Sequence, residues 1–379
     1  MDSKTRLETA WSFREPDRVP IELALHTNAR ELPEAKWLVD FEANEADNFL
    51  GVPGFDWGFF GLESEYREEI VEDVPGDYKR MRRTHTTEAG DFYAITKHRY
   101  DEYNPQDFHW ERRFIDTVEE LDRLGSAPRS PIPFNRQAYE KGLARHGNRG
   151  IVCVGLAHPL GRLVRWANME EVYIWMSREK RVIHTFLEST NDQVAASVAG
   201  VAETGLRVDF RNVALEMLIP PWMGPQAFDE LVFPYDKEVN DTVHEIGGRV
   251  RAHCHGNCGE FLERFVEMGI DSVEPLEPPP YGDNDLAEAK RKVGDRMLLS
   301  GNITSQDFPF MSDNEVRRAV KDAIRAGASG GGFTIRCTGG NCGTNSAKDV
   351  DQLRVFVRRI EVFIETALQC GSYPIRGLD

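Results

Sequence analysis

The chain has 379 residues, of which 40% are hydrophobic and 29% charged, so it can bury a full core beneath an ordinary globular surface. Its 63 acidic side chains outnumber the 46 basic ones and give a net charge of −17. This excess argues against a nucleic-acid partner, because nucleic acids bind clustered Lys and Arg side chains. It also argues against binding to an anionic membrane surface.

No apolar run in the sequence is as long as a membrane span, and the first residues lack the apolar core of a signal peptide. We therefore expect a cytoplasmic protein. Six cysteines are few for this length, and in a reducing compartment they indicate metal binding or simple burial rather than a disulfide framework. They are Cys153, Cys254, Cys258, Cys337, Cys342 and Cys370.

The N-terminal third has an irregular pattern. A short amphipathic helix is predicted over residues 3–13, and the stretch RVPIELAL, residues 18–25, has the composition of a first strand. Residues 77–102 carry a hairpin signal around Glu88-Ala89-Gly90-Asp91, which does not fit a strand–helix unit. We interpret about 77–135 as an inserted segment that ends in a Pro-rich connector at residues 126–134.

From residue 149 onward, predicted strands and helices alternate, which indicates parallel strands joined by helical crossovers. Either a closed barrel or an open sheet could follow, and the number of strands favours a single (β/α)8-barrel domain over residues 1–379. The predicted strands are 150–156, 207–215, 248–255, 271–275, 296–300 and 331–337, and the predicted helices are 160–176, 180–203, 226–245, 260–267, 285–292, 314–325 and 347–368.

The segment RVRAHCHGNCG, residues 249–259, carries the strongest chemical signal. If residues 250–255 form a strand, His253 and His255 share one face while Cys254 points to the other. Two imidazoles at the carboxyl end of a barrel strand make half of a plausible zinc site. The plainer interpretation is a pair of solvated histidines above inert buried cysteines.

Further metal ligands can come from neighbouring strand ends. Cys337 ends the last predicted strand, Cys342 lies in the Gly-rich loop after it, and the sequence does not decide between them. Glu274, at the end of the strand after the histidines, is a candidate fourth ligand and catalytic group. With one of these cysteines at a neighbouring strand end, we favour a bound zinc ion.

Four other polar residues are weaker candidates for substrate binding: His26, His158, Asn302 and Asp209. His26 and His158 each follow a predicted strand, and Asn302 ends another. Asp209 would share a strand face with Arg211, and the pair could equally form an ion pair inside the barrel. A polar loop residue and a helix cap are the simpler interpretations of His158 and Asn302.

Several stretches together resemble the superfamily of uroporphyrinogen decarboxylases and cobamide-dependent methyltransferases. They are KTRLETAWSFREPDRVPIEL near the start, LIPPWMGPQAFDELVFPYDKEVNDTVHEIGGRV in the middle, HCHGNCGEFLERFVEMGIDSVEPLE, and LLSGNIT. The resemblance covers nearly the whole chain. It implies a (β/α)8 barrel whose pocket lies at the strand carboxyl ends, and it leaves function to be argued from the site.

The zinc methyltransferase branch of this superfamily holds zinc with H-x-C and a late Cys. His253 matches the first position, His255 stands in place of the Cys, and the late Cys is Cys337 or Cys342. A neutral imidazole in place of a thiolate leaves zinc more electrophilic, which suits the activation of an oxygen or nitrogen leaving group. This departure weakens the case for a thiol acceptor and is compatible with demethylation of an ether.

The preferred hypothesis is therefore a zinc-dependent methyltransferase or demethylase that moves a methyl group between a small methylated substrate and the cobalt of a corrinoid on a separate partner protein. The alternative is a metal-free decarboxylase or lyase that acts on a carboxylated substrate. The decarboxylase branch carries an R-Q-A-G-R-Y type segment, whereas only Arg30 is basic near the corresponding stretch here. The sequence leaves the oligomeric state open, a homodimer included.

Overall fold

The computed structural model describes residues 1–100 and 108–378. Its centre is a parallel seven-stranded sheet in the order β1-β6-β7-β8-β9-β10-β11. The strands are β1 (Asn48–Val52), β6 (Gly150–Ala157), β7 (Asp209–Val213), β8 (Val250–His253), β9 (Ser272–Leu276), β10 (Leu298–Ile303) and β11 (Phe333–Cys337). This order confirms the predicted parallel α/β fold.

The sheet is curled, and residues 20–23 link its two edges. Ile21 forms a parallel bridge with Ile335 of β11. Its carbonyl also accepts a 2.8 Å hydrogen bond from the Asp47 N–H, just before β1. Two 2.8–3.0 Å hydrogen bonds join Leu23 to the Asn48 side chain rather than to its backbone. The first predicted strand is therefore reduced to isolated bridges, and the sheet has the half-barrel curvature of a TIM-like fold.

From β6 onward, helices follow the strands of the parallel sheet, as the alternating pattern predicted. The α-helices of the described residues are α1 (Ser3–Trp11), α2 (Thr27–Arg30), α3 (Lys36–Asn44), α4 (Val118–Gly125), α5 (Arg136–His146), α6 (Pro159–Trp166), α7 (Met169–Arg178), α8 (Lys180–Ala199), α9 (Pro225–Leu231), α10 (Phe233–Glu245), α11 (Leu262–Glu267), α12 (Leu286–Val293), α13 (Asp313–Gly327) and α14 (Val350–Cys370). None of the helices in the described ranges is long and apolar enough to cross a bilayer.

Two of the predicted helices are each divided in the structure. The 160–176 helix breaks where Ala167 adopts an extended conformation between α6 and α7. The 226–245 helix breaks at Val232, just before Pro234 enters the first turn of α10. Proline is accommodated in a first helical turn, but it cannot continue a helix from the preceding turn.

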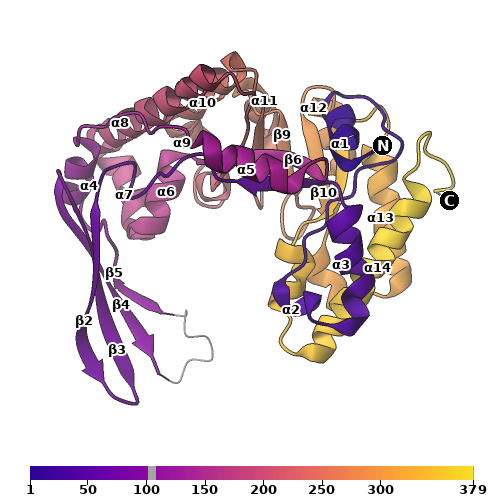
Figure 1. The fold of residues 1–379 in the computed structure, drawn as a ribbon, viewed down its shortest axis with the longest axis horizontal. Helices are drawn as coiled ribbons and strands as arrows, with labels where there is room; N and C mark the ends of the chain where they lie inside the picture. Colours follow the sequence, from indigo (N-terminus) through magenta and orange to yellow (C-terminus); the bar gives the residue numbers. More distant parts are fainter. Residues whose placement is uncertain (101–107, 379) are drawn as a thin grey trace.

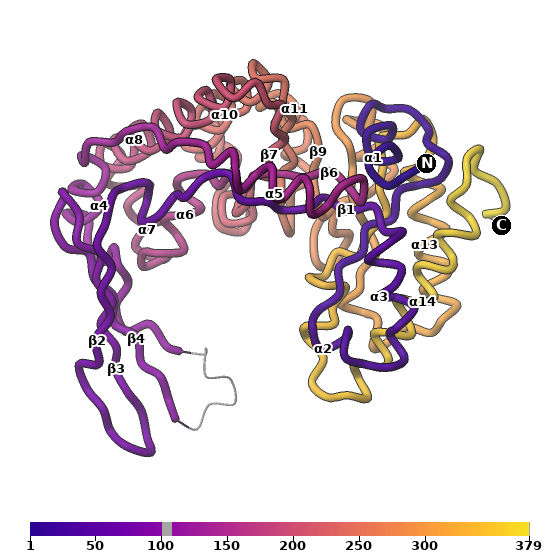
Figure 2. The backbone as a smooth tube through the Cα atoms, viewed as in Figure 1, coloured from indigo at the N-terminus to yellow at the C-terminus, as the bar shows by residue number. Residues whose placement is uncertain are grey.

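A separate antiparallel sheet projects away from the rest of the molecule (Figure 1). It consists of β2 (Glu65–Val74), β3 (Tyr78–Thr87), β4 (Gly90–Arg99) and β5 (His109–Arg112). The predicted hairpin corresponds to β3 and β4, and β2 extends the sheet beyond the predicted segment. The tube in Figure 2 shows that both chain ends lie on the opposite side of the molecule, near α1 and α13.

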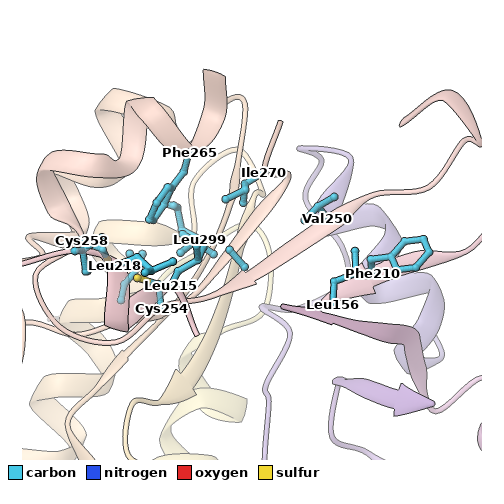
Figure 3. Close-up of a cluster of buried hydrophobic side chains, with 14 of the residues drawn as sticks. Leu156, Phe210, Leu215, Leu218, Val250, Cys254, Cys258, Phe265, Ile270 and Leu299 are labelled. Carbon is cyan, nitrogen blue, oxygen red and sulfur yellow. The ribbon is translucent and has the colours of Figure 1, made fainter. Parts of the chain in front are cut away.

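The main apolar core packs against the outer, convex side of the parallel sheet. Cys254 and Cys258, both fully buried, gather with Leu215 and Leu218 among apolar side chains (Figure 3). A smaller cluster, which includes Trp11, Ile151 and Leu298, closes the amino-terminal end of the sheet with α1. Polar side chains instead occupy the inner, concave side of the sheet.

Candidate functional site

Strand alternation sends Arg251 and His253 of β8 toward the concave side of the sheet. Arg251 is 1% exposed and donates two hydrogen bonds of 2.8–2.9 Å to the carboxylate of Glu22. The Ser272 and Ser300 hydroxyls lie 3.1 Å from the same guanidinium. This buried ion pair forms the floor beneath the carboxyl-terminal strand ends.

Glu274 of β9 lies one layer above that floor and is fully buried. Its Oε1 accepts hydrogen bonds from the Nε of Arg211, at 3.0 Å, and from the Nδ1 of His253, at 3.0 Å. Its Oε2 pairs with Arg336. Burial opposes ionisation, but the Arg336 charge and the His253 hydrogen bond hold the pKa of Glu274 well below its usual range. Both oxygens are engaged, so Glu274 orients His253 rather than offering a free ligand.

His255 lies just beyond the end of β8, because the strand ends at His253 rather than at the predicted residue 255. The two imidazole rings nevertheless remain neighbours, with centroids 4.7 Å apart and ring planes at 85°. His255 Nδ1 lies 3.1 Å from the buried carboxylate of Glu277. Burial opposes protonation, but this hydrogen bond raises the pKa of His255.

Both imidazoles are thus oriented in the same way, with Nδ1 on a buried carboxylate. In the described residues neither Nε2 has a hydrogen-bond partner. Metal-binding histidines commonly donate one ring N–H to a carboxylate while the other nitrogen faces the ion. His253 and His255 therefore fit half of a zinc site.

Both predicted sulfur ligands, Cys337 and Cys342, are buried. Arg336 faces Glu22 and Glu274, so the adjacent Cys337 faces outward. Cys342 lies in the 3-10 segment η6 (Gly340–Ser346), hydrogen-bonded to Cys337. That bond lowers the pKa of Cys342, whereas burial raises the pKa of Cys337 well above its usual value. Within residues 1–100 and 108–378, no three His, Cys, Asp or Glu side chains are arranged around a common metal position.

The four remaining predicted residues lie in different places. Asn302 is in register with Arg336 at the strand ends, partly buried. His26 is the N-cap residue of α2, donates its backbone N–H to the Thr344 hydroxyl at 3.2 Å, and has a buried Nδ1 without a hydrogen-bond partner in the described part of the chain. Asp209 and His158 have their partners outside this group.

Asp209 begins β7 at the opposite end of the sheet. There it pairs with Arg249 at 3.0 Å, not with Arg211 as the shared strand face suggested. His158 is 1% exposed, and its Nδ1 accepts a 3.1 Å hydrogen bond from the Leu160 N–H as a cap of α6. Burial lowers the pKa of His158 to about 3, so its imidazole is neutral near pH 7. Both residues have structural partners.

The sequence interpretation overlooked Arg336 and Glu277, which orient the site. Arg336 precedes Cys337 in FTIRC, so alternation within a strand places these two residues on opposite faces. That rule separates the two residues, but it does not say which of them points inward. Glu277 lies three residues after Glu274, beyond the strand end, where no periodicity predicts direction.

Comparison with known proteins finds similarity to uroporphyrinogen decarboxylases. The family model described as uroporphyrinogen decarboxylase (URO-D) matches residues 112–362. Uroporphyrinogen decarboxylase of Microcystis aeruginosa (strain NIES-843 / IAM M-2473) is 28% identical over 158 residues, which cover 40% of this chain and 41% of that protein. The enzyme of Aeromonas salmonicida (strain A449) is 27% identical over 183 residues, 46% of each chain. The matches thus span less than half the length of these relatives.

A solved structure, a methyltransferase from Methanosarcina mazei, resembles this chain with a TM-score of 0.55 and 14% sequence identity. The superposition covers 97% of this chain and 99% of that one. At this identity the likeness concerns the fold. The family model covers more than half of the sequence. Its residues 112–362 include all the stretches that carry the resemblance except the one near the start of the chain. The chain therefore belongs to the uroporphyrinogen decarboxylase (URO-D) family.

Proposed function

We propose that the protein is a zinc-dependent methyltransferase or demethylase. It moves a methyl group between a small methylated substrate, such as an ether, and the cobalt of a corrinoid carried by a separate protein. The observation that supports this proposal is the pair of imidazoles at the end of β8, each tied through Nδ1 to a buried glutamate. This pairing leaves two Nε2 atoms for a cation.

His253 and His255 would hold the zinc ion through nitrogen, with a cysteine as the third ligand. Cys342 suits this role better than Cys337, because Cys337 is fixed on the outward face of β11 while Cys342 lies in the loop beyond the strand end. Zinc bound there would act as a Lewis acid on the atom that loses or gains the methyl group. A shift of the η6 segment would be needed to bring the sulfur to the imidazoles.

The chain's own residues would prepare the site. Arg211 and Arg336 keep Glu274 ionised, and Glu274 in turn fixes the ring of His253. Glu277 does the same for His255 and accepts a 3.0 Å hydrogen bond from Gln306. The fold thereby supplies orientation, while the corrinoid supplies the methyl chemistry.

A second candidate function, a metal-free decarboxylase or lyase, is favoured by the charges on the concave side. Three guanidiniums, of Arg211, Arg251 and Arg336, face two carboxylates, of Glu22 and Glu274. Arg211 is also 38% exposed. A surplus guanidinium near the opening would suit a carboxylated substrate.

Metal content and methyl transfer together test the proposal. We expect about one zinc per chain by elemental analysis, and transfer of a methyl group from small methyl ethers to free cob(I)alamin as a surrogate acceptor. His253→Ala should lose both zinc and activity while the fold, followed by circular dichroism, is retained. His109→Ala, which alters an exposed histidine of β5, is the matched control and should change neither. Full activity after complete zinc removal would contradict the proposal and favour the decarboxylase.

A further inference from the structure

Arg162 of α6 is a partly buried cation without an anionic partner among residues 1–100 and 108–378. Its guanidinium approaches the carbonyl oxygens of Trp57 and Gly58 at 3.5 Å, and its Cζ lies 5.6 Å from the ring centre of Phe60. In the part of the chain that the structure describes, no carboxylate forms an ion pair with it. Burial lowers the pKa of Arg162 to about 10. Burying a charge without a partner is costly, so this arrangement needs an explanation.

Two further arginines lie close to Arg162. Arg129 donates to the Leu124 carbonyl at 2.9 Å and also to that of Phe60; burial, followed by the charge of Arg162, lowers its pKa to about 10. Arg165, one helical turn after Arg162, faces the same cavity. In a chain of net charge −17, three neighbouring arginines without an ion pair among the described residues give a local excess of positive charge.

Arg162 and Arg165 line a cavity of about 290 Å³ at the carboxyl ends of β6 and β7. Most of the other walls are apolar: Trp57, Leu156, Trp166, Val194 and Val213. Small-molecule pockets usually measure ~300–1,000 Å³, so this cavity suits a ligand of about one ring. Gly155, which also lines it, is in strand register with Arg211, so the cavity adjoins the candidate site.

We propose that this cavity binds a small carboxylate with a flat apolar body, whose carboxylate pairs with the guanidinium of Arg162 and whose body lies between Trp57 and Trp166. Guanidinium groups bind carboxylates through two parallel N–H donors, and the apolar walls would shield that pair from water. An inorganic anion would use the charge but leave these walls exposed to solvent. Binding of this ligand is tested independently of the proposed methyl transfer, because it is measured without turnover.

Calorimetric titration of the intact protein with benzoate, benzyl alcohol and inorganic phosphate tests the ligand class. We expect benzoate to bind and to raise the melting temperature. The two other probes should bind at least roughly tenfold more weakly, because benzyl alcohol lacks the carboxylate and phosphate lacks the apolar ring. Phosphate that binds as well as benzoate, or benzoate that does not bind at millimolar concentration, would overturn the proposal.

Two variants test the location. Arg162→Met keeps the aliphatic stem, and we expect it to weaken benzoate binding roughly tenfold or more without lowering the melting temperature. The matched control is Arg178→Met, on the exposed face of α7. Gly155→Val fills the cavity, because a Cβ at Gly155 meets no atom within 4 Å, and it should abolish binding without backbone strain. Benzoate binding that survives both Arg162→Met and Gly155→Val overturns the assignment.

Discussion

Asp236 of α10 buries a carboxyl group that accepts one side-chain hydrogen bond, of 2.8 Å, from the amide of Asn212 on β7. Burial raises the pKa of Asp236 to about 7. An aspartate in an unfolded chain titrates near ~3.9. The folded protein therefore keeps a proton here over a pH range in which the unfolded chain has lost it.

The sign of the resulting pH dependence follows from proton counting. Between about pH 4 and 7 the folded state binds more protons at this position, so its contribution to the free energy of unfolding falls as pH rises. Asp236→Asn keeps the shape and the Asn212 contact but removes the titration. We expect the free energy of unfolding of the variant to equal that of the wild type near pH 4 and to exceed it by up to ~4 kcal/mol at pH 8. Urea unfolding at several pH values measures this difference, and a constant difference across the range would contradict it.

For single residues, the sequence indicated which residues are candidates for the site better than it indicated where their side chains point. His253 and His255 were correctly placed side by side, although β8 ends before His255. Cys337 was expected at the site because it ends a strand, but its neighbour Arg336 takes the inward position. Direction at a strand end depends on which residue is the last to pair, and a single sequence leaves that open by one residue.

Helix α6 carries Arg162 and packs closely on the loop after β7. A Cβ at Gly161 would lie 2.7 Å from the Cβ of Ala214, so only glycine permits this approach. We expect Gly161→Ala to lower the free energy of unfolding by ~1–3 kcal/mol, because α6 must move outward. Gly200→Ala, at the end of α8, is the control: its Cβ meets nothing within 4 Å, and its φ of −60° suits alanine. Equal stability of the two variants in thermal unfolding would contradict the close-packing argument.

Elements with regular hydrophobic periodicity were predicted best. The strands and helices after residue 149 match the predicted alternation, apart from the two divided helices. Strand β2 was missed because EYREEIVEDV, residues 65–74, is too acidic to show an apolar face. It is stabilised by cross-strand charge instead: Glu68 is in register with Arg83, and the two side chains pair at 2.7 Å. Such pairing depends on a partner strand, which local patterns do not reveal.

Across the whole molecule, one buried ion pair connects segments that are distant in sequence. Glu22, in the segment that links the two sheet edges, pairs with Arg251 of β8 from 229 positions away. Both side chains are almost fully buried, and Thr334 of β11 donates to the same carboxylate at 2.6 Å. The curvature of the sheet thus brings its first and later parts into contact through polar atoms on its concave side.

Removal of one partner of this pair should affect the stability of the entire parallel sheet. We expect Arg251→Met to lower the free energy of unfolding by roughly 3–5 kcal/mol, because the Glu22 carboxylate is then buried with only Arg336 to balance it. The double variant Arg251→Met/Glu22→Gln removes that uncompensated charge and should regain much of the loss. Chemical unfolding of both variants measures the difference. If the double variant is no more stable than Arg251→Met, the loss comes from packing around the arginine stem, and the ion pair does not hold the two ends of the sheet together.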